Sequence, residues 1–293
     1  MPELPEVETV RRGLAPVVVG RRITDVETRR PDLRFPFPER FFERLVGQKV
    51  VSLDRRAKYL IAGLSSGEDL VMHLGMTGRF TIVQHGHRET PGEYTNTVGP
   101  NPAHDHLLLR LSNGSRIVYN DPRRFGFMVM MPHAERAQHP LFRGLGVEPL
   151  SPELAPQYLA RRAQGKKVNL KAFLMDQRIV AGLGNIYVSE ALFWARLSPN
   201  RAARTLADRR GAPTEPAKRL VPAIREVLEL AINAGGSTLR DYRDANGVSG
   251  GFQHRFAVYD RAGQPCPRPG CGGTIRRAVH AGRATFYCPR CQR

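Results

Sequence analysis

The chain of 293 residues has no long apolar run and is poor in cysteine, tryptophan and acidic residues. No stretch approaches the roughly 20 consecutive apolar residues that cross a bilayer, and no basic segment followed by an apolar one marks a signal peptide. We therefore expect no membrane partner and a cytoplasmic location. All four cysteines lie beyond residue 265, so no disulfide framework organises the rest of the chain.

Acidic residues are too few to balance the basic ones. The chain has 45 lysines and arginines but 27 aspartates and glutamates, which gives a net charge of +18. A charge of this size indicates a polyanionic partner. The basic residues are spread along the chain and form no polybasic run beside an apolar anchor, which favours nucleic acid over a membrane surface. The alternative is a proteome whose proteins are generally rich in arginine.

The length allows two domains, and the first half reads as β-structure. Short β-type runs alternate with turn signals between residues 48 and 131, which predicts an antiparallel sandwich or barrel. The expected strands cover residues 49–53, 58–64, 70–74, 79–84, 106–111, 116–120 and 125–131. Asn113-Gly114 predicts a two-residue type I′ hairpin turn. Residues 85–105 lack periodicity and predict a long mobile loop.

Helical patterns replace strand patterns after residues 132–150, where we place a linker between domains. Ser151-Pro152-Glu153 combines a capping serine, a proline and an acid, so a helix is expected to begin there. Further helices are expected at 168–177, 186–197 and 217–234. Two glycines precede Asn185, which is suited to cap the helix expected at 186–197. The free N–H groups at the start of that helix could then bind a phosphate. A plain helix-to-helix turn is the alternative that these residues alone favour.

The four cysteines form two close pairs near the end of the chain, Cys266 with Cys271 and Cys288 with Cys291. Sixteen residues separate the pairs, a spacing typical of one structural zinc ion. Two disulfides are the alternative. Residues 274–277 and 283–287 predict the strands of a hairpin that carries the cysteines, and a metal would replace the hydrophobic core that so small a unit cannot build.

The first residues can supply a nucleophile. Removal of Met1 would make the ring nitrogen of Pro2 a free secondary amine, which attacks an acetal carbon to give an iminium. A free α-amino group titrates near ~8, and the helix expected from Pro5 onward would disfavour its ammonium form. Glu3 could serve as the acid or base. These residues alone favour the simpler interpretation of a processed end and a helix-capping acid.

Residues 2–10, PELPEVETV, resemble the amino terminus of the formamidopyrimidine-DNA glycosylases, bacterial enzymes that excise oxidised purines from DNA. Matching motifs continue through nearly the whole chain, and their joint occurrence is more specific than any one of them. They are RRAKYL with Lys58, HLGMTG with His73 and Met76, DPRRFG with Arg123 and Phe125, GLGNIYVSE with Asn185, and GRATFYC with Arg283.

The resemblance implies an α+β multidomain fold. It would comprise an N-terminal antiparallel β-sandwich with flanking helices, a C-terminal helix-two-turn-helix domain and a β-hairpin zinc finger. The boundaries we predict are 1–135 for the catalytic domain, 136–150 for the linker, 151–250 for the helical domain and 251–293 for the finger. Residues 235–251 would form a loop that covers the extruded base.

The resemblance also implies roles for single residues. Pro2 would be the nucleophile and Glu3 its acid, with Lys58 and Arg283 at the reacting sugar and its phosphates. His73, Met76, Arg123, Phe125 and Asn185 would bind DNA. Within this group, Met76, Arg123 and Phe125 would fill the void left by the flipped base, and the arginine would read the orphaned cytosine. One Zn²⁺ would bind Cys266, Cys271, Cys288 and Cys291, although four residues separate the first pair instead of the family's usual two.

The implied function is a bifunctional DNA glycosylase and AP lyase of base excision repair. It would act as a monomer on damaged double-stranded DNA in the bacterial cytosol or nucleoid. Its substrates would be 8-oxoguanine and formamidopyrimidines, released through a Schiff base on Pro2 and followed by β,δ-elimination. Two alternatives remain: an endonuclease VIII-like glycosylase for oxidised pyrimidines, and a non-catalytic, zinc-dependent protein that binds DNA damage.

Overall fold

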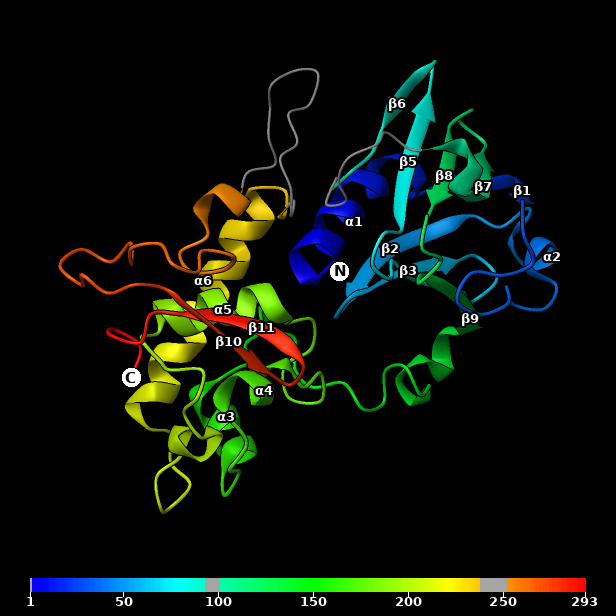
Figure 1. Cartoon of the computed structure of the whole chain (residues 1–293). Coiled ribbons are helices and arrows are strands. Elements are labelled where there is room, and N and C mark those ends of the chain that lie inside the picture. The colour runs from blue at the N-terminus through cyan, green and yellow to red at the C-terminus, as the bar shows by residue number, and fades with distance from the viewer. Residues whose placement is uncertain (1, 93–100, 238–251) are drawn as a thin grey trace. The chain divides into compact units, whose positions relative to one another are not determined.

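The computed structural model describes residues 2–92, 101–237 and 252–293. They belong to two compact units, one made of Met1–Arg143 with Ala234–Gly251 and the other of Gly144–Asn233 with Phe252–Arg293. Figure 1 traces the elements of both units. Part of the loop predicted at 85–105, and all but the first three residues of the loop predicted at 235–251, lie outside the described residues.

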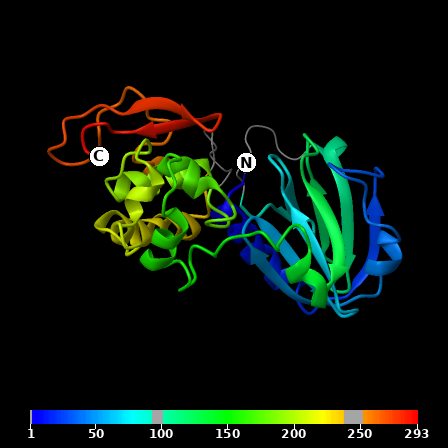
Figure 2. The same ribbon diagram turned by 90° about the horizontal axis from the view of Figure 1, so that it is seen from below.

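The first unit contains two antiparallel sheets, which confirms the predicted sandwich (Figure 2). One sheet has the order β1 (Ile23–Thr28), β7 (Asp105–Leu111), β8 (Arg116–Asn120), β5 (Arg79–Gln84) and β6 (His87–Glu89). The other has the order β2 (Val50–Arg56), β3 (Tyr59–Leu64), β4 (Glu68–His73) and β9 (Phe127–Pro132). Helix α1 (Leu4–Val18) packs against β2 and β3, and the short α2 (Phe41–Leu45) packs against β1.

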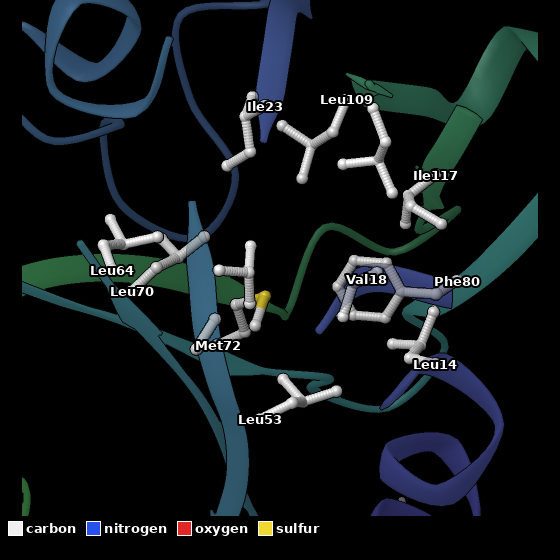
Figure 3. A pocket seen from close by; sticks show the side chains of 13 residues that line it. Leu14, Val18, Ile23, Leu53, Leu64, Leu70, Met72, Phe80, Leu109 and Ile117 are labelled. Carbon is white, nitrogen blue, oxygen red and sulfur yellow. The ribbon is translucent and has the colours of Figure 1, made fainter. Parts of the chain in front are cut away.

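The core of this unit lies between the sheets. Figure 3 shows side chains from α1 and from both sheets pointing toward one another around a cavity of about 40 Å³. Leucine, isoleucine, valine, alanine, methionine and phenylalanine side chains line this cavity. Because the lining offers no polar group to orient a ligand, we regard the cavity as a packing defect of the core.

Three local predictions in the first unit are wrong. Strand β1 escaped prediction because a register irregularity between Ile23 and Asp25 breaks the alternation of buried and exposed residues. Strand β6 lies inside the predicted loop at 85–105 and pairs antiparallel with β5. The hairpin at Asn113-Gly114 forms, but of these two residues Gly114 alone has a positive φ, 80°. The Gly114 N–H donates to the Leu111 carbonyl, as in a three-residue loop that ends in a glycine bulge.

The second unit is helical and ends in a hairpin. Its helices are α3 (Pro156–Ala163), α4 (Leu170–Met175), α5 (Asn185–Trp194) and α6 (Glu215–Asn233), and its strands are β10 (Arg276–His280) and β11 (Arg283–Tyr287). Strand β11 packs against α5.

The 3₁₀ turns of the described residues are η1 (Pro102–His104), η2 (His133–Gln138), η3 (Ala203–Leu206) and η4 (Phe252–Arg255). Within the described ranges, no helix combines the length and apolarity needed to cross a membrane.

The helix predicted to start at Ser151 begins instead at Pro156. The Ser151 hydroxyl donates to the Glu148 carbonyl and accepts the Glu153 N–H, which closes a turn rather than capping a helix. Ala155 precedes a proline and is extended, with φ −117° and ψ 158°. A following proline disfavours helical backbone at this position, so helix α3 cannot extend backward.

Candidate active site and nucleic-acid interface

Pro2 and Glu3 lie at the amino-terminal end of α1, and both are buried. Glu3 is the N-cap residue and forms a capping box with Glu6: its side chain accepts the Glu6 N–H, and its own N–H donates to Glu6 Oε2 at 2.8 Å. Pro2 therefore directly precedes the end of the helix where the backbone dipole is positive. A positive potential at this point lowers the basicity of a free amine.

Lys58 lies in the tight turn between β2 and β3 and is only 7% exposed. The residue before it, Ala57, has a φ of 53°, a left-handed conformation that is uncommon for alanine. Arg55 Nη1 donates to the Ala57 carbonyl at 3.0 Å, and Arg55 Nε lies 3.3 Å from Glu8 of helix α1. This chain of contacts ties the turn that carries Lys58 to helix α1, which Glu3 caps.

Glu8 anchors that network. Burial raises the pKa of Glu8, but hydrogen bonds and charge interactions with Arg11, Arg12 and Arg55 outweigh it and lower the pKa to about 2. Glu8 is therefore ionised at neutral pH. Because three guanidinium groups share it, Glu8 is a structural anion and is unsuited to proton transfer near pH 7.

His73 ends strand β4, and its ring stacks on Phe127 with the ring centroids 5.2 Å apart. Its Nδ1 accepts the Gly75 N–H at 3.0 Å. Burial, with the positive charges of Lys58 and Arg34, lowers the pKa of His73 to about 4. The imidazole is therefore neutral at neutral pH, with Nε2 left to carry its proton. It can donate a hydrogen bond without adding charge beside Lys58.

The structure brings together the two loops that carry Met76, Arg123 and Phe125. Gly75 has a φ of 62°, and a Cβ there would lie 2.3 Å from the Phe125 carbonyl carbon, so the loops touch through their backbones. The Arg123 N–H also donates to the Thr77 hydroxyl at 3.2 Å.

The three side chains themselves are accessible. Met76 is 37% exposed and Phe125 is 43% exposed, while the Arg123 guanidinium lies 4.7 Å from the centroid of the Phe125 ring. An exposed methionine and phenylalanine beside a guanidinium form a wedge that can enter a base stack.

Asn185 belongs to the second unit, where Gly184 is the N-cap of α5 and Asn185 is its first residue. The prediction that Asn185 caps the helix is therefore wrong. Its Nδ2 donates to the Tyr259 hydroxyl at 3.3 Å, and its buried Oδ1 has no hydrogen-bond partner among the described residues. Gln177 holds the preceding turn, because its side chain accepts the Gly182 N–H and donates to the Leu183 carbonyl.

The sequence motifs do not predict two buried charged residues of the second unit. Glu190 is fully buried and accepts three successive N–H groups, from Ala257, Val258 and Tyr259, at 2.8 to 3.0 Å. Burial raises the pKa of Glu190, and the three donors oppose this shift. In the sequence, a charged residue inside an apolar helix could have indicated this site, because such a residue needs hydrogen-bond partners when it is buried.

Lys171 is the second of these residues and is also fully buried. Its Nζ donates to the Ala284 carbonyl at 2.8 Å and to the Thr285 hydroxyl at 2.7 Å, so it binds α4 to strand β11. Arg283, at the start of β11, is exposed beside the tip of the hairpin. Both tip residues, Ala281 and Gly282, have positive φ, as a type I′ turn requires.

The four cysteines converge at the base of the same hairpin. Their Sγ atoms lie within 4.8 Å of one another, with Cys266–Cys291 at 3.8 Å and Cys271–Cys288 at 3.6 Å. A tetrahedral ion with metal–sulfur bonds of about 2.3 Å places sulfurs about 3.8 Å apart, whereas a disulfide needs about 2 Å. The cysteines are thus positioned to bind a metal.

Comparison with known proteins finds three modules in sequence order. The formamidopyrimidine-DNA glycosylase N-terminal domain matches residues 1–128, the H2TH domain of the same enzymes matches residues 145–243, and a zinc finger found in FPG and IleRS matches residues 263–293. A β-sandwich, an H2TH domain and a zinc finger together place this protein in the class of DNA glycosylases.

Close relatives share the full length. Formamidopyrimidine-DNA glycosylases from Beijerinckia indica and Methylocella silvestris are 60% and 59% identical, with 100% of each chain covered. MutM (Fpg) from Thermus thermophilus is 43% identical with a TM-score of 0.79, covering 99% of this chain and 98% of that one. The Lactococcus lactis Fpg complex with abasic-site DNA is 31% identical with a TM-score of 0.83 over 100% of both chains. This chain belongs to the formamidopyrimidine-DNA glycosylase family.

Proposed function

We propose that this protein is a bifunctional DNA glycosylase and AP lyase that excises oxidised purines, 8-oxoguanine and formamidopyrimidines, from duplex DNA. The observation that carries the proposal is the position of Pro2 and Glu3 at the amino-terminal end of α1, where the Pro2 nitrogen and the Glu3 carboxyl group belong to adjacent residues. Removal of Met1 is required, because the nitrogen of Pro2 is otherwise an unreactive amide.

The reaction begins when the Pro2 nitrogen bonds to C1′ of the damaged nucleotide and the glycosidic bond breaks. The electron pair of that bond leaves on the base, which takes up the proton that the Pro2 nitrogen loses. Glu3 protonates the sugar ring oxygen, which opens the ring and leaves an iminium between Pro2 and C1′. The iminium acidifies C2′, whose proton is lost as the bond from C3′ to its phosphate oxygen breaks. A second elimination breaks the bond at C5′, and water then releases Pro2.

The proposed DNA contacts follow from the accessible groups in each unit. Met76, Arg123 and Phe125 would fill the void left by the flipped base, and Lys58 would bind a phosphate near the reacting sugar. The neutral His73 would donate from Nε2. In the second unit, Asn185 and the exposed Arg283 would bind the backbone. Structures of the Lactococcus lactis protein contain abasic-site DNA and a Fapy-dG derivative in DNA, which supports damaged duplex as the partner.

We also propose that the metal is a single Zn²⁺. Four cysteine ligands with sulfur separations near 3.8 Å suit a closed tetrahedral zinc site, which has no open position for catalysis. The ion would hold the hairpin that presents Arg283. Thiolate ligation also favours a reducing compartment, in agreement with the bacterial cytosol and nucleoid, where the DNA lies.

Because one chain supplies every residue of the proposed reaction, we propose a monomer.

The test is borohydride trapping on a duplex with one 8-oxoguanine opposite cytosine, using protein tagged at the carboxyl terminus. We expect a covalent adduct that mass spectrometry maps to Pro2. Tight binding of the same duplex without an adduct would instead identify a damage-binding protein. Faster trapping on thymine glycol than on 8-oxoguanine would identify a glycosylase for oxidised pyrimidines.

The matched control carries an extension before Pro2, so that its nitrogen is an amide. We expect this protein to bind the lesion duplex within about two-fold of the original affinity, since the change removes one reactive amine and no phosphate contact. It should form no adduct. An adduct in this control would place the nucleophile elsewhere.

A further inference from the structure

Trp194, the chain's one tryptophan, is the last residue of α5 and is 52% exposed. Its ring meets the buried ring of Phe193 edge-on, with centroids 5.5 Å apart. Tryptophan buries more apolar area than most side chains when it is covered, and it is enriched among the residues that dominate binding energy at interfaces. An exposed tryptophan at a helix end therefore makes the surrounding surface a candidate binding site.

Two grooves meet at Trp194, and we name their combined lining the Trp194 surface. One groove has a volume of about 300 Å³ and runs between the end of α5 and the segment from Cys266 to Cys271. The other has a volume of about 480 Å³ and runs along α6. Besides Trp194, the lining includes Arg196, Arg219, Pro222, Arg255, Arg268 and Pro269.

The Trp194 surface is strongly basic around its apolar centre. Among the described residues, five arginines line the two grooves, whereas Glu226 is the one carboxylate in their lining. Of these arginines, Arg196, Arg219 and Arg255 are exposed. Apolar anchors with a rim of one charge are complementary to a peptide that has an apolar side chain among acidic ones.

The unusual cysteine spacing builds one wall of this surface. The four residues between Cys266 and Cys271 include Pro267, Arg268 and Pro269, and all three line the groove. Arg268 Nη2 donates to the Phe193 carbonyl at 2.7 Å, and its guanidinium lies 4.7 Å from the centroid of the Phe193 ring. The additional residues of the spacer thus form an ordered wall beside Trp194.

Arg196 provides an independent observation. It has a φ of 58° directly after the last turn of α5, where the Arg196 and Leu197 N–H groups donate to the Phe193 and Leu192 carbonyls. This pattern is the Schellman motif, whose left-handed position usually holds glycine. A non-glycine residue is strained in this conformation. The strained position carries an arginine that lines the groove, which suggests a function that offsets the strain.

The Trp194 surface lies away from the proposed DNA contacts of its own unit. Asn185 is at the opposite end of α5, roughly 14 Å along a helix that rises about 1.5 Å per residue. Arg283 is at the tip of the hairpin, whereas the groove borders the cysteines at its base, about 17 Å away along a strand that rises about 3.3 Å per residue. A DNA backbone held by Asn185 and Arg283 would leave this surface accessible to another molecule.

We propose that the Trp194 surface binds an acidic peptide segment of a partner protein, with an aromatic or aliphatic side chain packed against Trp194. The exposed arginines pair with carboxylates on both sides of this anchor. Because the surface is separate from Asn185 and Arg283, binding is compatible with lesion DNA on the same chain. The peptide would recruit the protein to a partner without occupying its proposed catalytic residues.

The test uses the full chain and a ten-residue probe peptide with a phenylalanine–leucine pair flanked by aspartates. Trp194 is the one tryptophan, so its emission reports this surface directly. We expect a saturable blue shift, protection of Trp194 from acrylamide quenching, and weaker binding at high salt. A peptide with serine–glycine in place of the apolar pair should bind at least about 10-fold more weakly, the loss expected for one buried anchor.

Charge reversals distinguish a specific surface from general attraction. Arg219→Glu with Arg255→Glu should weaken peptide binding about 10-fold or more, whereas the control Arg209→Glu with Arg210→Glu should change it less than about two-fold. Equal losses in both pairs, or no change in Trp194 emission, would overturn the proposal. So would a result in which the first pair weakens duplex DNA binding and leaves peptide binding intact, because the surface would then bind nucleic acid.

Discussion

Glu6 and Ser237 are 231 residues apart in the sequence and share one carboxylate oxygen. Glu6 Oε1 accepts both the Ser237 N–H, at 2.8 Å, and the Ser237 hydroxyl, at 2.9 Å. The other oxygen, Oε2, accepts the Glu3 N–H. Gly236, with a φ of 87°, allows the backbone to approach Glu6 closely. A single side chain thus joins the proposed catalytic terminus to the residue that precedes 238–251.

Glu6→Gln should weaken both connections. A glutamine amide has one acceptor oxygen, so it cannot accept hydrogen bonds on both terminal atoms. We expect a loss of about 1–3 kcal/mol in the free energy of unfolding and a lower rate of borohydride trapping. Urea unfolding and the trapping rate provide the measurements. The exposed Glu43→Gln should be neutral within about 0.5 kcal/mol; a Glu6 variant as stable and as fast as this control would contradict the expectation.

The Glu8 cluster predicts a specific acid sensitivity. The folded-state pKa of about 2 lies below the ordinary value of 4.5, so the stabilisation is complete above pH 4.5 and is lost as the pH falls toward 2. Allowing for solvent screening, we expect about 1–2 kcal/mol. Glu8→Gln should remove this part of the pH dependence, measured as the urea midpoint against pH. An unchanged slope between pH 4.5 and 2 would contradict the assignment.

Gly75→Ala should separate the two loops that carry Met76, Arg123 and Phe125. The new Cβ would lie 2.3 Å from the Phe125 carbonyl carbon, at a φ of 62°. We expect a loss of about 2–4 kcal/mol in stability, from backbone strain plus overpacking, together with weaker binding of lesion duplex. Gly67→Ala is the matched control, because Gly67 has a φ of 83° but open space around it. It should lose only about 1 kcal/mol, and equal effects in both variants would argue against the loop contact.

Removal of the metal should unfold the finger selectively. Cys271→Ser leaves three thiolates, so we expect loss of the proposed zinc ion, measured by elemental analysis, and a fall in DNA affinity of about 10-fold or more. Val279→Ser, on the exposed face of β10, should retain zinc and affinity. Full DNA affinity in the Cys271 variant without zinc would show that the hairpin does not depend on the ion.

Local patterns predicted most of the elements. The strands from β2 to β5 and from β7 to β9 follow from short β-type runs, and the finger strand β11 follows from residues 283–287. The prediction failed where a neighbour altered the local choice. Pro156 shifted the start of α3, and the type I′ turn forms at Ala281-Gly282 rather than at Asn113-Gly114. Turn types depend on how the flanking strands pair, which a dipeptide does not specify.

The sequence by itself determined the amino-terminal Pro2-Glu3 pair, the four cysteines and the order of the modules, because each depends on residue identity and short spacing. Tertiary structure decided which distant groups became partners. Glu6 accepts hydrogen bonds from Ser237, and Glu190 accepts them from the N–H groups of residues 257–259. Lys171 donates to strand β11. A buried charge must find hydrogen-bond partners wherever the folded backbone presents them, and no local spacing reveals where that will be.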